Sequence, residues 1–212
     1  MSDLSELYLT ILNGDTKGTL ALTREALAGG ADPLDLVSRY MTPAMAEVGR
    51  LFECEEYFVP ELMRSAQAMK GALALIRPLL TASGAEPAGR VVIGTVKGDR
   101  HDIGKNLVAS MLEGGGFEVH DIGADASPEK FVQAVREHNP DLVCLSTLLT
   151  VTMRAVPLTI QALKDAGLRD RVRVLVGGAP VTEQWALEVG ADGYGANAAA
   201  AVPLARRMVG KA

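Results

Sequence analysis

Aromatic residues, cysteines and clustered positive charges are all scarce in this chain of 212 residues. Aromatic side chains make up only 4% of it, so the core that its 48% hydrophobic content supplies must consist mainly of Ala, Leu, Val and Met, which suits helices and a buried parallel sheet. The two cysteines, Cys54 and Cys144, are too few for a disulfide framework and have no Cys-x-x-Cys spacing. The formal charge of −5, without a basic stripe, argues against a protein that binds nucleic acid.

Long apolar runs are also missing. No stretch approaches the roughly 20 apolar residues that a membrane-spanning helix needs. Residues 1–6 contain no positively charged region ahead of an apolar run, which is the pattern of an export signal. We therefore expect no membrane partner and a cytoplasmic protein.

The first 82 residues predict one helix after another. Leu4, Leu7, Ile11 and Leu12 recur at steps of three and four residues, and later segments repeat this spacing. The segments near 4–12, 16–28, 33–52 and 60–76 are separated by Gly, Asn, Asp and Pro, so each has a start or stop signal. Four helices of this length predict a helix bundle.

The remainder of the chain has a different period. Residues 83–89 are small, polar and interrupted by Gly and Pro, which indicates a linker between a helical domain at 1–82 and a second domain at 90–212. In the second domain, apolar strands near 90–96, 117–122, 141–146, 172–177 and 191–195 alternate with helices near 103–113, 128–138, 152–166, 181–189 and 197–209. This alternation predicts an α/β fold of the flavodoxin-like (Rossmann-like) type, with a five-stranded parallel sheet covered on both faces.

The most informative motif is the run Asp99-Arg100-His101-Asp102-Ile103-Gly104, which directly follows the first predicted strand. Open α/β sheets bind ligands at this end of their strands. A neutral histidine binds a metal through one ring nitrogen when the other nitrogen is held, often by a carboxylate, and Asp99 lies two residues before His101. Gly104 lets the backbone approach a flat ligand. On the residues alone, a solvated loop with Asp99 in an Asx turn remains an alternative.

Two further signals lie at the ends of other strands. Residues 146–152 follow the apolar run at 142–145, and Gly177-Gly178 follow the run at 172–176. All three segments should meet at one edge of the sheet, because the carboxyl ends of parallel strands lie together.

The ordered set resembles the cobalamin-binding domain of methionine synthase and the stand-alone corrinoid proteins of methyltransferase systems. The resemblance covers about residues 34–209. It implies that His101 is the lower axial ligand of cobalt, that Asp99 orients it, and that Thr152, otherwise a helix N-cap, extends the hydrogen-bonded relay. It also implies that Ser146 meets the buried nucleotide base, while Gly177 and Gly178 admit the tail.

The same resemblance extends to a cap. Phe52 matches the Phe that covers the upper face of the corrin in that family, and Val59 stands where the family has a Leu; both are otherwise ordinary core residues. Ala198 falls where the family lines the remaining part of the tail pocket. The cofactor-binding residues implied by position are Phe52, Val59, Gly98, Asp99, Arg100, His101, Asp102, Ile103, Gly104, Ser146, Leu148, Thr150, Thr152, Gly177, Gly178 and Ala198.

The function that follows is that of a methyl carrier. The resemblance implies that the cofactor is cobalamin, as methylcobalamin or a related corrinoid with cobalt, and that His101 binds the cobalt in place of the displaced nucleotide base (base-off, His-on). It implies partners that are separate substrate-specific and acceptor-specific methyltransferases, together with a reductive activase. The sequence contains no carboxylate pair, nucleophile–base set or P-loop for independent catalysis, so we expect a subunit rather than a complete enzyme.

Other readings stay open at this point. An adenosylcobalamin-dependent sensor has a similar helical domain, but usually a DNA-binding domain and a cap with a Trp and an extra His; here the one Trp is Trp185 and no His precedes His101. A mutase subunit or a flavodoxin-like module for FMN or a nucleotide is also compatible with the fold. The methyl donor, the acceptor and the oligomeric state are not specified by the sequence.

Overall fold

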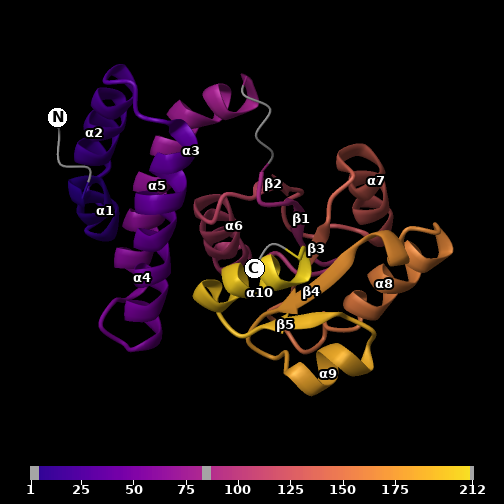
Figure 1. Cartoon of the computed structure of the whole chain (residues 1–212). Helices are drawn as coiled ribbons and strands as arrows, with labels where there is room; N and C mark the ends of the chain where they lie inside the picture. The colour runs from indigo at the N-terminus through magenta and orange to yellow at the C-terminus, as the bar shows by residue number, and fades with distance from the viewer. Residues whose placement is uncertain (1–4, 83–86, 211–212) are drawn as a thin grey trace. The chain divides into compact units, whose positions relative to one another are not determined.

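The amino-terminal part of the chain is helical, as its apolar spacing predicts. The computed structural model describes residues 5–82 and 87–210. The helices α1, α2, α4 and α5 contact one another, and their buried side chains include Leu7, Ile11, Val48, Leu62 and Met69. The elements of this unit are α1 (Ser5–Leu12), α2 (Thr16–Ala28), α3 (Pro33–Leu36), the π-helical turn η1 (Val37–Met41), α4 (Thr42–Glu53) and α5 (Val59–Ala82) (Figure 1).

The predicted third helix is not one regular α-helix. It starts as predicted, because the Asp32 side chain accepts the N–H groups of Leu34 and Asp35. Pro43, however, lies in the first turn of α4. A proline cannot donate to the carbonyl four residues earlier and its ring crowds that carbonyl, so the helix changes to the wider turn η1 just before it. Hydrophobic spacing alone did not reveal this change.

The second unit is the predicted α/β fold. The chain divides into two compact units, residues up to Pro87 and residues from Ala88, with Glu113–Gly116 grouped with the first unit. Residues 83–86 of the predicted linker lie outside the described residues, so the linker stays a prediction. The strands β1 (Arg90–Thr95), β2 (Glu118–Asp121), β3 (Leu142–Ser146), β4 (Arg173–Gly177) and β5 (Gly193–Gly195) are all parallel, in the order β2-β1-β3-β4-β5.

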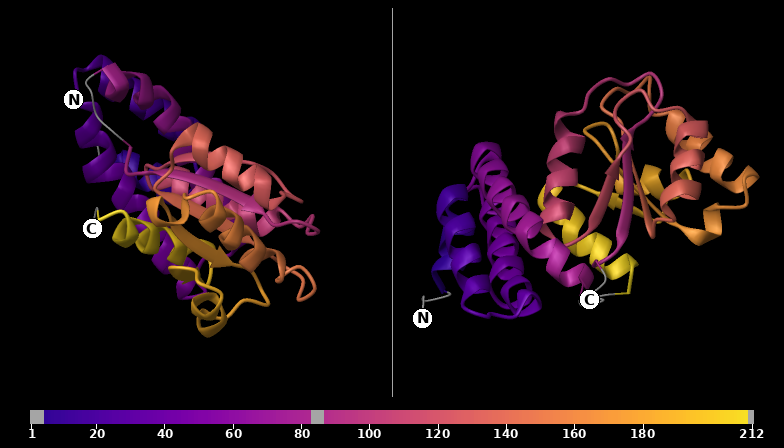
Figure 2. Two further views of the ribbon diagram at one scale, coloured as in Figure 1. Left: turned by 90° about the vertical axis from the view of Figure 1, so that its right-hand side faces the viewer. Right: turned by 90° about the horizontal axis from the view of Figure 1, so that it is seen from above.

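Helices cover both faces of this sheet, as the right-hand view of Figure 2 shows. Val92 and Val143 point to one core with α7 (Pro128–His138), α8 (Ala155–Asp165) and α9 (Glu183–Glu188). Val91 and Cys144 point to the other core with α6 (Ile103–Gly114) and α10 (Ala198–Met208). Arg169–Arg171 forms a short 3-10 helix, η2, before β4. Because successive residues of the central strands alternate between two buried faces, β1, β3 and β4 are largely apolar, whereas the edge strand β2 (Glu118–Asp121) is mostly polar and none of its residues is fully buried.

None of the helices within residues 5–82 and 87–210 combines the length and the apolar character that crossing a bilayer requires.

The two cysteines occupy contrasting positions, which gives a test of the strand assignment. Cys144 is buried in β3, and Cys54 is exposed at the end of α4. Burial raises the pKa of the Cys144 thiol to about 12, so little of the reactive thiolate forms at about pH 8. We expect a disulfide-exchange reagent to modify Cys54 in the native protein and Cys144 only after unfolding. Peptide mass mapping distinguishes the two, and rapid native labelling of Cys144 would contradict its burial.

Candidate functional site

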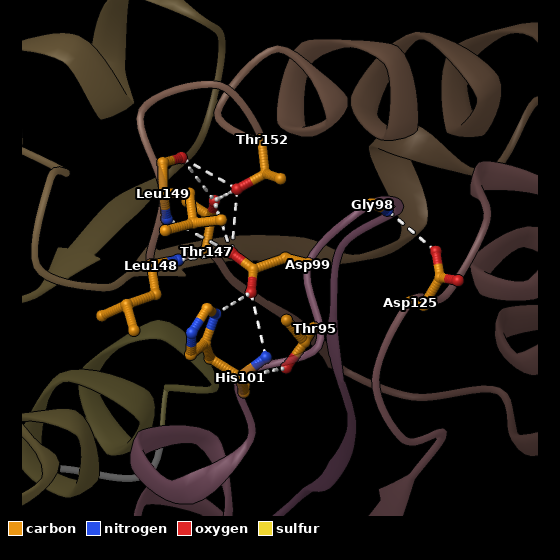
Figure 3. Close-up of polar contacts among 9 residues, drawn as sticks. All are labelled: Thr95, Gly98, Asp99, His101, Asp125, Thr147, Leu148, Leu149 and Thr152. Atoms are coloured by element: carbon orange, nitrogen blue, oxygen red, sulfur yellow. Dashed lines mark hydrogen bonds and ion pairs between the residues drawn. The ribbon is translucent and has the colours of Figure 1, made fainter.

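The loops that follow β1, β3 and β4 meet at the carboxyl edge of the sheet. The register aligns the last residue of β1 with Ser146, and Ser146 with Gly177. Ser146 accepts a hydrogen bond from the Val96 N–H, and Gly177 accepts one from the Thr147 N–H at 3.1 Å. The three segments singled out in the sequence are therefore side by side, although they lie far apart along the chain. Figure 3 shows the loops after β1 and β3 in contact.

At the centre of this edge, Asp99 holds the ring of His101. The Asp99 Oδ1 atom lies 2.8 Å from His101 Nδ1 and accepts the His101 backbone N–H at 3.0 Å. The hydrogen bond from the His101 backbone N–H forms the Asx turn that the sequence suggested. This turn places the imidazole next to the Asp99 carboxylate. The Asp99 side chain is fully buried, whereas 51% of the His101 side chain is exposed.

The other oxygen of Asp99 joins the loop after β1 to the loop after β3. Its Oδ2 atom accepts the N–H of Leu148 at 2.7 Å and of Leu149 at 3.3 Å, and the hydroxyl of Thr152 at 2.8 Å. Thr147 Oγ1 lies 3.4 Å from the same oxygen and 2.8 Å from Thr152 Oγ1. The predicted relay of His101, Asp99 and Thr152 is thus present as geometry, with Thr147 as an additional member.

These contacts determine the charge state of the site. Burial raises the pKa of Asp99, but hydrogen bonds from Leu148, from the backbone and ring of His101 and from Thr152 outweigh it and hold the pKa well below its ordinary value. Asp99 is therefore ionised at neutral pH. An ionised carboxylate can only accept a hydrogen bond, so in the neutral imidazole of His101 Nδ1 is the donor and Nε2 carries the free lone pair.

Further contacts fix the backbone of the loops around Asp99 and His101. The Thr95 hydroxyl donates to the His101 carbonyl at 2.9 Å. Gly98 has a φ of +85° and Gly178 a φ of +130°, both in the region that favours glycine. A Cβ on Gly178 would overlap the carbonyl oxygen of Thr147, so glycine is needed there for the loops after β3 and β4 to approach.

The remaining predicted site residues of the α/β unit lie around this cluster. Arg100, Asp102, Ile103 and Gly104 are exposed at and before the first turn of α6, and Leu148 and Thr150 are exposed in the loop after β3. A Cβ on Gly104 would meet no atom of the described residues within 4 Å, so the start of α6 offers an open surface. Ser146 is half-buried, and Ala198 is buried at the start of α10.

Phe52 and Val59 belong to the helical unit. Phe52 is half-buried near the end of α4, and the Val59 side chain, the first of α5, is 41% exposed. Their role as a cap of the corrin stays a prediction.

One sequence expectation about Thr152 is wrong. Thr152 is not a helix N-cap, because α8 begins at Ala155 and not near 152. Thr152 instead ends a turn in which its backbone N–H donates to the carbonyl of Leu149 at 3.0 Å, and its Oγ1 atom lies 2.8 Å from the same carbonyl oxygen. Its hydroxyl is therefore directed at the β3 loop and at Asp99, which suits the relay and not the helix.

The Thr152 hydroxyl should contribute measurably to stability. Replacing Thr152 by Val leaves the buried Asp99 carboxylate without one of its donors, and we expect the free energy of unfolding to fall by about 1.5–3 kcal/mol. Thr150→Val, at an exposed position in the same loop, should change it by less than about 0.5 kcal/mol. Urea unfolding followed by the fluorescence of Trp185, which packs against the α/β core, measures both. Equal effects of the two variants would contradict the hydrogen bond.

Comparison with known proteins identifies the family. The family described as B12 binding domain matches residues 89–202, and a second one with the same description matches residues 4–77. The chain is 40% identical over 208 residues to the dimethylamine corrinoid protein of Methanosarcina barkeri, covering 97% of each chain. This chain belongs to the corrinoid proteins. Solved structures agree with this.

The corrinoid protein has the fold of two solved relatives. It matches a cobalamin-binding protein from Desulfitobacterium hafniense with a TM-score of 0.82 and 32% identity, over 98% of this chain and 99% of that one. It also matches a chain of the methanol:cobalamin methyltransferase complex from Methanosarcina barkeri, with a TM-score of 0.84 and 28% identity over 97% of this chain and 79% of that one.

The donor set fits a corrinoid. A corrin ring supplies four nitrogen ligands to its cobalt, so the protein needs to add a single axial donor. His101 offers one nitrogen, Nε2, on a half-exposed ring whose other nitrogen is held by Asp99. The exposed side chains of Ile103 and Leu148 and the open backbone of Gly104 provide apolar surface beside it.

Proposed function

We propose that this corrinoid protein binds cobalamin with the nucleotide base displaced and His101 in its place, and carries a methyl group between two methyltransferases. The observation that supports it best is the His101–Asp99 pair. It leaves Nε2 as the only free ring nitrogen, on a side chain that is 51% exposed at the ligand-binding edge of the sheet.

The protein contributes to the chemistry by controlling where the proton lies on the His101 ring. A bound corrinoid supplies cobalt, which accepts and gives up methyl groups. Asp99 holds the proton on Nδ1 of His101 and fixes the ring plane. Asp99 would hold the His101 ring in this orientation both with and without a metal at Nε2. Thr152 and Thr147 stabilise the negative charge of Asp99 in either case.

The nucleotide tail is assigned to the edge that begins at Ser146. Ser146 ends β3 with its side chain half-buried, and Gly177 and Gly178 follow on the neighbouring strand. A Cβ on Gly177 would lie 3.1 Å from the Gly195 carbonyl oxygen, so the backbones of the β4 and β5 ends already approach closely. The buried Ala198 opens α10 directly beyond β5. This set of small residues supports a narrow site for the base.

The helical unit is proposed as the cover of the upper corrin face. Phe58, Val59 and Met63 expose 64%, 41% and 52% of their side chains near the start of α5, and Phe52 lies one short turn earlier in the sequence. These residues offer a flexible apolar surface that suits a methyl group. The predicted linker at 83–89 would let this cover move when a methyltransferase needs access.

The partners are proposed to be separate methyltransferases, one for the donor and one for the acceptor, with a reductive activase. The name of one relative, a methanol:cobalamin methyltransferase complex, supports this class of partner. The donor itself, whether an amine, methanol, a thioether or an ether, is set by the partner enzyme.

A labelled methyl group tests the carrier role. The reduced holoprotein is methylated with isotope-labelled methyl iodide, freed of reagent, and mixed with an acceptor methyltransferase of a corrinoid system and its thiol substrate. We expect the label to move to the thiol. Retention of the label on the chain with every acceptor enzyme tested, together with tight binding of adenosylcobalamin and a light-dependent change of oligomeric state, would favour a sensor instead.

A further inference from the structure

The loop after β2 holds the His101 loop from the side opposite to β3. Asp125, in this loop, accepts the Gly98 N–H on its Oδ1 atom at 2.8 Å (Figure 3). The Asp125 N–H in turn donates to the Asp99 carbonyl at 2.8 Å. These two hydrogen bonds form a reciprocal clamp on consecutive residues, which we call the Asp125 clamp. Asp99 is thereby fixed at both ends, its carboxylate by the β3 loop and its carbonyl by Asp125.

Both residues of the Gly98–Asp125 contact have a positive φ. Asp125 has a φ of +51°, and Gly98 has a φ of +85°. This backbone conformation is strained for residues other than glycine, and the strain is smallest for Asp and Asn. In the same loop, Ala126 donates to the Thr95 carbonyl at 2.9 Å, and Gly123, with a φ of +82°, accepts the Thr95 N–H at 2.9 Å. Asp125 is the non-glycine residue of this loop that has a positive φ, and it is the one that contacts the His101 loop.

The charge of Asp125 fits the same role. The Gly98 N–H, and then the nearby Lys97 ammonium, hold the pKa of the Asp125 carboxyl below its ordinary value. Lys97 Nζ lies 3.0 Å from Asp125 Oδ1, but its side chain is 58% exposed, so this ion pair is weak. The Gly98 contact is the one that reaches the loop.

From these contacts we infer that Asp125 is a positioning residue for His101, acting through the backbone of Gly98 and Asp99. The inference rests on the proposed coordination of a corrinoid by His101. Only Arg100 separates the clamped Asp99 from His101, and the Asp99 carboxylate that orients the ring belongs to the clamped segment. A loose Gly98–Asp99 backbone changes the angle at which Nε2 is presented, and so weakens its bond to the metal.

Three variants separate the parts of the clamp. Asp125→Asn keeps a carbonyl oxygen for the Gly98 N–H and tolerates the positive φ. Asp125→Gly keeps the φ and the backbone bond to Asp99, but removes the side-chain acceptor. Lys97→Met removes the exposed ion pair and leaves the clamp. Each variant is produced with histidine labelled with heavy nitrogen and all other residues unlabelled. It is then loaded with cob(II)alamin.

The readout is the electron paramagnetic resonance spectrum of the cobalt. Coordination by labelled His101 splits each line into a doublet, whereas the unlabelled nucleotide base would give a triplet. We expect Asp125→Asn and Lys97→Met to match the wild type. In Asp125→Gly, we expect the ratio of histidine-coordinated to uncoordinated cobalt to fall about tenfold, the effect of losing the one hydrogen bond that holds the Gly98 N–H.

Amide hydrogen exchange of Gly98 in the protein without corrinoid gives a second readout. We expect faster exchange in Asp125→Gly and not in Lys97→Met. A wild-type ratio in Asp125→Gly overturns the positioning role while the proposed function stands, and so does an equal loss in Asp125→Asn, since the charge and not the clamp would then matter. Absence of the doublet in the wild type overturns the proposed function and this inference together.

Discussion

Replacing Asp99 by Ala should lower the free energy of unfolding of the α/β unit by about 3–4 kcal/mol. The carboxylate is fully buried and accepts hydrogen bonds from two loops, including the Leu148 N–H at 2.7 Å and the Thr152 hydroxyl at 2.8 Å. Its removal leaves these buried donors unpaired, and the loss of its volume adds a small cavity. Urea unfolding followed by Trp185 fluorescence measures the change, because Trp185 packs against the α/β core.

The conservative variant separates the shape of Asp99 from its charge. Asp99→Asn fills the same volume, but its amide nitrogen must face donors at one of the two oxygen positions, so we expect a loss of about 2 kcal/mol. Asparagine also holds His101 Nδ1 less strongly, and the affinity of His101 for the metal should fall by about 10–100-fold. Asp170→Ala, at an exposed position in η2, is the matched control and should change stability by less than about 0.5 kcal/mol. A loss in Asp99→Ala no greater than in this control would show that the carboxylate does not join the loops.

The second large effect is expected at Gly178. Ala at this position must adopt a φ of +130° with its Cβ overlapping the Thr147 carbonyl oxygen, so the β4 loop has to move away from the β3 loop. We expect a loss of about 3 kcal/mol or more, with retained secondary structure. Far-ultraviolet circular dichroism and thermal unfolding measure both quantities.

Gly104→Ala is the matched control for Gly178→Ala. A Cβ at Gly104 would meet no atom of the described residues within 4 Å, and the position lies in the first turn of α6, so the unfolding free energy of the protein without corrinoid should stay within about 0.5 kcal/mol of the wild type. If the open face of Gly104 receives the flat ring, the same change should weaken corrinoid binding. Equal stability losses in the two variants would contradict the close approach of the loops at Gly178.

The fold was predictable because its signals are local and repeated. The apolar runs of β1, β3 and β4 cannot face solvent, and their alternation with amphipathic helices leaves a parallel sheet as the arrangement that buries them. The strand order β2-β1-β3-β4-β5 confirms the flavodoxin-like prediction. The η1 turn was missed, because the effect of Pro43 depends on hydrogen bonds and not on which face of the helix is apolar.

The candidate site was predictable only in part. The pairing of Asp99 with His101 follows from a spacing of two residues in a loop, and the structure contains it. The parts contributed by Thr147 and Asp125 depend on contacts between loops distant in sequence, so no local pattern revealed them. One signal was available: an aspartate after Gly123-Ala124 can adopt a positive φ, as Asp125 does. The start of α8 was placed too early, because residues 150–154 form a turn that resembles a helix in its spacing.

Magnetic resonance of the cob(II)alamin-loaded wild-type protein, prepared with heavy-nitrogen histidine, tests the central claim most directly. If the Nε2 atom of His101 is the axial ligand, labelling converts the nitrogen triplet into a doublet, and His101→Ala abolishes the doublet without unfolding the protein, because half of that side chain is exposed. A triplet that persists in the labelled protein would mean that the nucleotide base remains bound to the metal, and would contradict the account.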